Sequence, residues 1–284
     1  LSNPDLKWET TAQANIGLDF GWKQNKISGS LDVYDKLTTD LFISSPQSVA
    51  ATGFTSVNAN GGEMSNKGIE LTLKYNAIKT DNFNLSFFAN GSYNKNEILD
   101  LGRDREIIDS GGRTVLQVGQ PINSFYAVKW AGVNPVNGNN LYYDIDGNVT
   151  ENFSLEDRVF IDKSSYPTYQ GGFGFNSSYK GFSLDTQFSF VADIYRNNGS
   201  LGVIEDPTLI SNSNGSVTLL DAWQQPGDIT NIPSLNTASI RNRSTDRYIE
   251  DASFLRLRNV TLGYNFDSIM NDKWAISGLK VYLQ

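Results

Sequence analysis

The sequence of 284 residues contains no cysteine and no histidine. Without thiols or imidazoles, the chain cannot hold a Cys/His zinc site, use a thiol nucleophile or assemble a triad that contains histidine. Basic residues are also outnumbered, with 23 Lys plus Arg against 31 Asp plus Glu and a formal net charge of −8. A nucleic-acid-binding protein needs a basic face to meet phosphates. We therefore expect no cofactor and no nucleic-acid partner.

Long apolar runs are missing as well. No stretch approaches the ~20 apolar residues of a membrane-spanning helix, and the mean hydropathy is negative. Aromatic residues nevertheless make up 12% of the chain, and glycine contributes 25 residues. Such a composition suits a membrane β-barrel, because residues facing lipid alternate with residues facing the lumen. The chain opens on Leu1 without a signal-peptide pattern, and it stops inside a strand-like pattern, so we expect it to be part of a longer polypeptide.

Period-two alternation of apolar and polar residues is the dominant pattern. From Trp8 to Trp22, every even position is apolar or small and every odd position is polar or glycine, with the exception of Thr10. Fifteen alternating residues exceed the usual strand of ~5–6 residues and suffice for a tilted transmembrane strand of ~9–11 residues. A long strand of a soluble sandwich is the alternative interpretation. Tryptophan at both ends favours the membrane, where aromatic side chains lie at the two interfaces.

The same alternation recurs in seven further segments, and the connections between them follow a rule. Short turns alternate with long connections, the long ones falling approximately at residues 43–67, 95–168 and 195–251. Outer-membrane barrels have short periplasmic turns and long extracellular loops. The sequence therefore predicts an all-β fold, an antiparallel transmembrane barrel fragment of about eight long strands. The residues expected to face lipid include Ile16, Leu18, Phe20, Leu71, Leu73 and Leu85.

The stretch from Tyr248 to Phe266 contains a change of phase. Val260, Leu262, Tyr264 and Phe266 share even positions, whereas Leu255 and Leu257 are odd. A phase change within a strand indicates either a bulge or a change of surroundings, which we place at Arg258 and Asn259. Arg256 and Arg258 share a face. A neighbouring strand is one expected contact for them, and solvation at the barrel mouth is the alternative.

Five blocks of sequence are spread over the chain. The segment EDASFLRLRNVTLGYNF ends at Phe266, GEMSNKGIELTL spans residues 62–73, and GQPINSFY begins at Gly119. The segments NPDLKWE, from Asn3, and PTYQGGF, from Pro167, complete the series. In sequence and in order, these blocks resemble the C-terminal half of SusC/RagA-type TonB-linked outer-membrane transporters, whose plug domain would be a contact for Arg256 and Arg258. The resemblance covers essentially the whole chain, from residue 1 to residue 284, and identifies it with the C-terminal part of a receptor barrel domain that is incomplete at both ends.

The resemblance implies a 22-stranded barrel in the bacterial outer membrane, with a plug in its lumen. It also implies active import of oligosaccharides or peptides, with energy delivered by TonB through an N-terminal region and with a SusD-like surface lipoprotein as a lid. The barrel wall and extracellular loops would be the contribution of this chain. A self-contained eight-stranded barrel acting as an anchor or adhesin is the first alternative. An outer-membrane hydrolase is the second, and the missing histidine argues against it.

Aromatic residues in the long connections are the candidates for contacts with a ligand or with the lid. Their rings would stack on sugars or on apolar peptide side chains, and packing inside the loops is the alternative for each. The candidates are Trp130, Tyr142, Tyr143, Tyr166 and Trp223.

Acidic residues in the second long connection suggest two further chemistries. Asp144, Asp146 and Asn148 carry hard oxygen ligands suited to Ca²⁺, but Gly147 follows too early for an EF-hand, and a type I′ turn at Asp146-Gly147 explains the motif better. Glu151, Glu156, Asp157 and Asp162 are candidates for a glycosidase pair. No pair stands out by spacing, and solvated side chains are the simpler interpretation. We therefore expect no catalytic residues and no enzyme.

Overall fold

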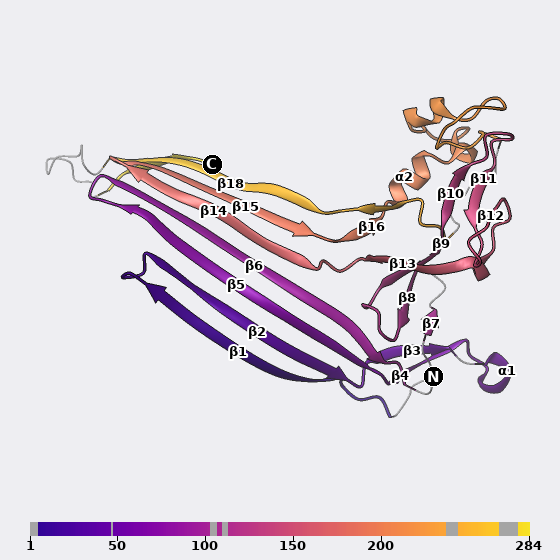
Figure 1. Ribbon diagram of the computed structural model, residues 1–284, viewed down its shortest axis with the longest axis horizontal. Helices are drawn as coiled ribbons and strands as arrows, with labels where there is room; N and C mark the ends of the chain where they lie inside the picture. The colour runs from indigo at the N-terminus through magenta and orange to yellow at the C-terminus, as the bar shows by residue number, and fades with distance from the viewer. Residues whose placement is uncertain (1–4, 47, 103–106, 110–112, 237–243, 267–277) are drawn as a thin grey trace.

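The computed structural model describes residues 5–46, 48–102, 107–109, 113–236, 244–266 and 278–284. Within these residues, eight strands form one antiparallel sheet in which every strand pairs with its neighbours along the chain (Figure 1). In sheet order they are β1 (Thr10–Trp22), β2 (Ile27–Thr39), β5 (Glu63–Lys79), β6 (Phe83–Asp100), β14 (Tyr169–Tyr179), β15 (Phe182–Ala192), β18 (Phe254–Asn265) and β19 (Lys280–Leu283). The prediction of eight alternating strands is confirmed.

The register of the sheet brings apolar residues of neighbouring strands onto one face. Ile16 pairs with Val33, Val33 with Ile69, Ile69 with Tyr93, and Tyr93 with Tyr169. We call this side the apolar face. Nothing in the described part of the chain packs over Ile16, whose side chain is 79% exposed. The opposite side carries Glu70, Ser92 and Gln170 in register, and we call it the polar face.

Tight turns connect the strands at one end of the sheet, the turn end. Lys180 and Gly181 join β14 to β15 and both have positive φ, 46° and 90°. These values match a type I′ turn, whose twist suits a two-residue hairpin. Residues 23–26 and 80–82 form the other described turns, and Lys26 N donates to Lys23 O at 3.1 Å. The turn expected at residues 267–273 lies outside the described residues.

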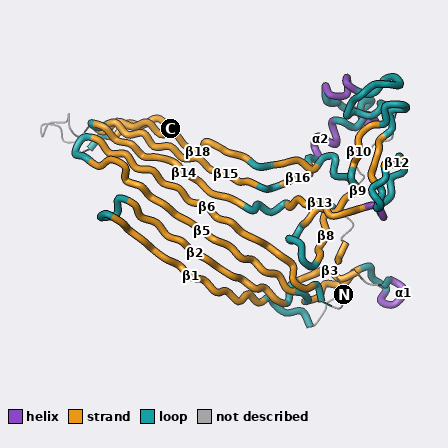
Figure 2. The backbone as a smooth tube through the Cα atoms, in the orientation of Figure 1, coloured by secondary structure: helices purple, strands orange, loops and turns teal. Residues whose placement is uncertain are grey.

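The long connections gather at the other end of the sheet, the loop end, where they build small sheets and short helices (Figures 1 and 2). Two paired strands, β3 (Phe42–Pro46) and β4 (Ser56–Asn60), flank α1 (Val49–Thr52) in the first connection. The third contains β16 (Tyr195–Asn197), α2 (Gly199–Ile204) and β17 (Ile249–Asp251), with 3₁₀ turns at Pro207–Leu209 and Val217–Asp221.

The second connection contains two small sheets. A four-stranded sheet has the order β13 (Arg158–Ser164), β9 (Ser124–Val128), β8 (Thr114–Gln117) and β7 (Ile107–Asp109). A three-stranded sheet contains β10 (Trp130–Val133), β11 (Asn140–Tyr143) and β12 (Val149–Thr150), and a 3₁₀ turn spans Leu155–Asp157. Lys129 separates β9 from β10, and the two strands belong to different sheets because β9 pairs with the distant β13.

The predicted bulge in β18 is confirmed. Gln187 of β15 pairs with Asn259, and the next residue, Phe188, pairs with Leu257, so Arg258 has no opposite residue. This one extra residue restores the phase: Leu257 and Val260 both pair with residues of the apolar face. The bulge also turns Arg258 towards the polar face, where its Nε donates to Ser189 Oγ at 2.8 Å.

Two predicted loop boundaries need correction. β5 begins at Glu63 and β6 continues to Asp100, so the loop expected at residues 43–67 ends earlier and the loop expected at 95–168 starts later. The pairs Ser65–Glu97 and Asn66–Asn96 are polar on both sides of the sheet. Because neither face is apolar there, the period-two signal disappears although the strands continue.

One phenylalanine that interrupts the polar face has a structural reason. Phe88 pairs with Gly174 of β14, and a Cβ on that glycine would lie 2.6 Å from the Phe88 ring. The ring therefore covers the space that the missing side chain leaves, as aromatic residues do opposite glycine in sheets. Among the described residues, no helix has the length and apolar character needed to cross a membrane.

Candidate functional site

The polar face of the sheet contains a hollow of about 500 Å³ near the loop end. Glu70, Thr72, Asn90, Gln170 and Arg258 contribute to its lining, so carboxylate, amide, hydroxyl and guanidinium groups all reach it. Arg258 arrives there because of the bulge in β18. This arrangement can bind a polar surface by hydrogen bonds, but it does not place two carboxylates together.

The segment Gly119–Ile122 is fixed to the outer part of β6. Gly119 N donates to Ile98 O at 2.8 Å, Ile98 N donates to Gln120 O at 2.9 Å, and Ile122 N donates to Asn96 Oδ1 at 2.7 Å. Asn96 in turn donates to Asn66 Oδ1 at 2.9 Å. In the sequence, this segment is visible only as part of the block GQPINSFY. Its hydrogen bonds show that it anchors the second connection to the main sheet.

A buried charged cluster joins the second connection to the third. Arg247 lies over the ring of Trp130, with its guanidinium carbon 4.3 Å from the ring centroid, and forms an ion pair with Glu205 at 3.5 Å. Both charged side chains are more than nine-tenths buried. Asp246 accepts a hydrogen bond from Trp130 N at 2.8 Å, and burial raises the pKa of its carboxyl group. Sequence reasoning missed this cluster because its members are far apart along the chain.

Three of the five candidate aromatic residues point into the loop structure. Trp130 stacks on Arg247 and donates from Nε1 to Asn140 Oδ1 at 3.1 Å. Tyr142 is 1% exposed and packs edge-on against Phe153, so it has no surface to offer a ligand and follows the packing alternative.

Trp223 also serves the packing of the loops. Its Nε1 donates to Pro135 O at 3.1 Å. Its ring lies against Gly138, which has a φ of +75° and whose Cβ, if present, would come within 2.5 Å of the ring. The tryptophan therefore joins two connections that are distant in sequence.

Tyr143 and Tyr166 present exposed rings, with 38% and 48% of their surfaces accessible. Tyr143 lines a hollow of about 360 Å³ together with Lys129, Asp144 and Asp157. A ring beside charged hydrogen-bonding groups is suited to a sugar or to a peptide segment. Tyr166 does not line this hollow.

The turn at Asp146-Gly147 differs from the type I′ geometry that we predicted. Gly147 has a φ of +84°, whereas Asp146 does not have a positive φ. Gly147 N donates to Asp144 O at 3.0 Å, and Asp144 Oδ1 accepts hydrogen bonds from the backbone of Asp146 and Asn148. The hydrogen bond from the Asn148 side chain, together with these backbone bonds, holds the pKa of Asp144 below its usual value. The carboxylate therefore stabilises the turn from Asp144 to Asn148.

Glu151 has an equally local role. Its carboxylate accepts hydrogen bonds from the side chains of Asn134, Asn137 and Asn139 at 2.6, 2.8 and 2.8 Å. These three bonds lower the pKa of Glu151. Within the described ranges, no group of three or more acidic residues is arranged to hold a metal ion. Of the other acidic candidates, Asp157 accepts from Ile145 N at 3.1 Å.

The comparisons with known proteins agree with one another. Residues 1–190 match the family model "TonB dependent receptor-like, beta-barrel". The chain is 28% identical over 317 residues to a TonB-dependent receptor of Formosa agariphila, and this match covers 94% of the chain and 30% of the receptor. It is 30% identical over 297 residues to the TonB-dependent receptor SusC of Bacteroides thetaiotaomicron, covering 94% and 27%.

Solved structures give the same result. A chain in the structure of the RagAB peptide transporter matches with a TM-score of 0.89 and 32% identity, over 99% of this chain and 32% of that chain. The RagAB peptide importer in its "open-open" state matches with a TM-score of 0.88 and 33% identity, over 99% and 31%. The chain thus spans less than a third of the length of these relatives.

Proposed function

The chain belongs to the TonB-dependent receptor family, as part of a SusC/RagA-like β-barrel of the outer membrane, and we propose that the protein containing it is an active importer of oligosaccharides or peptides. The family consists of transporters and not of enzymes. One observation carries the proposal: the match to the RagAB peptide transporter covers the main sheet and also the small sheets and helices of the three long connections, which we call the loop layer. The loop layer would collect cargo, and the sheet would form the wall of the path.

The apolar face of the sheet would meet lipid. On β6, ten residue steps separate Phe83 from Tyr93, and on β14 the paired residues Tyr179 and Tyr169 are equally far apart. At ~3.4 Å per residue this is ~34 Å along the strand. A strand tilt of ~40° reduces it to ~26 Å, close to the ~25 Å apolar band of outer-membrane barrels.

Apolar residues fill the band between these two aromatic rows. The predicted lipid-facing residues lie there in register, because Phe20 is followed across the sheet by Gly29 and Leu73, and Leu18 by Leu31 and Leu71. Leu85 lies near the turn end, opposite Ser177. The next row towards the loop end contains Asp35, Lys67 and Lys95, and its charges mark the edge of the band.

The open sheet supports membership of a larger barrel over a self-contained one. In the described residues, β1 and β19 lie at opposite edges of the sheet and do not pair with each other. An eight-stranded anchor would need these two strands to close the ring. Unpaired edges expose backbone donors and acceptors to lipid, which is unfavourable. Further strands of a 22-stranded barrel, with a plug in the lumen, would pair with both edges.

Cargo and lid contacts are assigned to the exposed aromatic residues of the loop layer. Tyr143, in its hollow with Lys129 and Asp144, and Tyr166 have accessible rings. One relative of known structure is the RagAB peptide transporter. We assign to this protein an equivalent SusD-like surface lipoprotein as lid, and TonB as its energy-coupling partner. Arg256 and Arg258 on the polar face would contact the plug, in addition to the bond of Arg258 to Ser189.

Affinity purification and growth assays test the proposal. The complete protein, tagged and purified from its native membrane, should bring a surface lipoprotein with it. Deletion of its gene should abolish growth on at least one member of a panel of oligosaccharides and peptides offered as sole nutrient, and deletion of TonB should abolish growth on the same compound. Recovery without a lipoprotein, together with unchanged growth on every compound, would contradict the proposal.

A further inference from the structure

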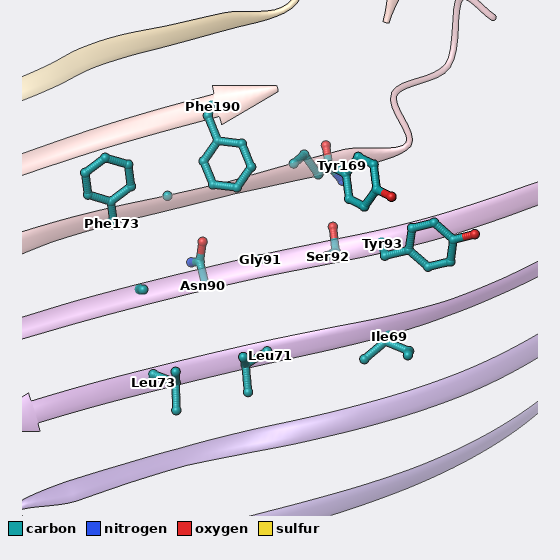
Figure 3. Close-up of a pocket in the computed structure, with 13 residues that line it drawn as sticks. Ile69, Leu71, Leu73, Asn90, Gly91, Ser92, Tyr93, Tyr169, Phe173 and Phe190 are labelled. Atoms are coloured by element: carbon teal, nitrogen blue, oxygen red, sulfur yellow. The ribbon is translucent and has the colours of Figure 1, made fainter. Parts of the chain in front are cut away.

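A groove of about 680 Å³ runs over the apolar face between β5 and β15 (Figure 3). Gly91 of β6 lines its floor, and Gly91 pairs with Gly171 of β14 on this face. On either side of this pair, Leu71 and Phe190 occupy the same row. The groove exists because two neighbouring strands lack side chains where their neighbours carry large ones.

The two glycines differ in the space available for a side chain. A Cβ on Gly171 would lie 2.3 Å from the backbone oxygen of Asn90, so close strand packing requires glycine there. A Cβ on Gly91 would meet nothing nearer than 3.9 Å. The space above Gly91 is therefore open, although the strand itself does not require glycine at this position.

Towards the loop end, a second apolar hollow of about 440 Å³ adjoins the groove. The two hollows share the lining residues Ile69 and Tyr93, and the charged residues Asp35, Lys67 and Lys95 also line the second one. The ring of Tyr93 lies beside that of Tyr169 in the groove, with ring centroids 5.4 Å apart. Together the two hollows, which we call the channel, are apolar and end at two ammonium groups and one carboxylate, a polarity that suits an amphiphile whose anionic head takes the place of the carboxylate.

Both lysines could exchange their present carboxylate partners for a phosphate. Lys67 forms an ion pair with Asp35 at 3.0 Å and Lys95 with Glu97 at 2.7 Å, and both lysine side chains are largely exposed. Exposed ion pairs contribute little to stability. A phosphate, with three acceptor oxygens, would form stronger charge-assisted bonds with both ammonium groups at once.

We propose that this channel binds a phosphate-bearing lipid of the outer leaflet. The phosphate would lie between Lys67 and Lys95, and an acyl chain would run over Gly91 towards Phe173 and Leu73. Six residue steps from Lys67 to Leu73 span ~20 Å along the strand, or ~16 Å of depth at a tilt of ~40°, which is close to one leaflet. The proposal rests on the assignment of the apolar face to lipid.

Native mass spectrometry of the intact protein, purified from outer membranes in detergent, tests the site. The probes are lipid A and chemically dephosphorylated lipid A. The wild-type protein should bind the phosphorylated form preferentially. Changing Lys67→Gln with Lys95→Gln should weaken that binding about tenfold or more, the scale of losing a charged hydrogen bond. Gly91→Leu should weaken binding of both lipids by filling the groove.

Two controls separate the site from general effects. Lys74→Gln removes a lysine from the polar face of the same strand and should leave binding unchanged. Lys67→Arg with Lys95→Arg keeps both charges and should retain the preference for phosphate. Equal binding of the two lipids by the wild-type protein would overturn the phosphate site and leave the lipid-facing assignment standing. Binding of neither lipid would contradict both.

Discussion

Arginine substitutions at increasing depth along β5 give the sharpest quantitative prediction. Leu73, Leu71 and Ile69 share the apolar face and differ only in their distance from the aromatic row of Tyr93. Leu73 lies four residue steps from that row, ~14 Å along the strand and therefore ~10 Å deep in a band of ~26 Å. Ile69 lies in the row itself, and Leu71 lies between them.

The expected costs follow from these depths. An arginine facing lipid near the midplane costs ~2–4 kcal/mol, and one near the interface costs ~0–1 kcal/mol. Leu73→Arg should therefore lower the free energy of unfolding by about 2–4 kcal/mol, Ile69→Arg by at most about 1 kcal/mol, and Leu71→Arg by an intermediate amount. Thr72→Arg is the matched control, since Thr72 lies on the polar face of the same strand, two residues before Lys74.

Urea titration of the full-length protein folded into lipid vesicles measures these differences, with tryptophan fluorescence as the signal. Heat-modifiable migration on a gel shows whether each variant has assembled. A flat series, or an equal cost for Leu73→Arg and Thr72→Arg, would refute the assignment of the two faces.

Three further predictions concern the ends of the sheet and the loop layer. A cysteine at Ser213, in the third connection, should react with a membrane-impermeant maleimide on intact cells, whereas a cysteine at Gln24, at the turn end, should react only after permeabilisation; the opposite labelling would invert the orientation. The pKa of Glu151 is lower in the folded protein than its unfolded value of 4.5. The stabilisation from its bonds to three asparagines is therefore complete above pH 4.5 and is lost as the pH falls through the folded pKa. Limited proteolysis at neutral pH should therefore cut Glu151→Ala faster than wild type, and the difference should shrink in acid. Arg247→Ala leaves Glu205 buried without its partner and should destabilise the loop layer by about 3–5 kcal/mol, while Arg247→Met with Glu205→Met should recover much of this loss; equal protease sensitivity of single and double variants would contradict the argument.

The main sheet was predictable from the sequence because its strands lie between two different environments. The strands of the main sheet present apolar side chains on one face and polar side chains on the other, so the period of two is visible in the sequence. It is lost in the outer parts of β5 and β6, which are polar on both sides. Even the bulge at Arg258 left a visible signal, since one extra residue moved Leu255 and Leu257 to odd positions.

The loop layer was less predictable because its contacts are non-local. The pairing of β9 with β13 joins residues 30 to 40 positions apart, and Lys129 carries no signal that it separates two sheets. Of the adjacent Tyr142 and Tyr143, the first is buried because it packs against Phe153. Phe153 comes close to it only in the folded loop, so the sequence does not show which of the two tyrosines is exposed. The turn at Gly147 deviated from type I′ because Asp144 supplies side-chain bonds that stabilise a larger turn.

Spin labels along β5 test the central claim, that one face of this sheet meets lipid and the other lines the lumen. The chain has no cysteine of its own, so single cysteines at residues 69–74 of the full-length protein can each carry a nitroxide. The account predicts that relaxation by oxygen, which dissolves in lipid, is high at Ile69, Leu71 and Leu73 and low at Glu70, Thr72 and Lys74. Relaxation by a water-soluble nickel complex should stay low at the odd positions. Loss of this period of two, or its reversal, would contradict the account.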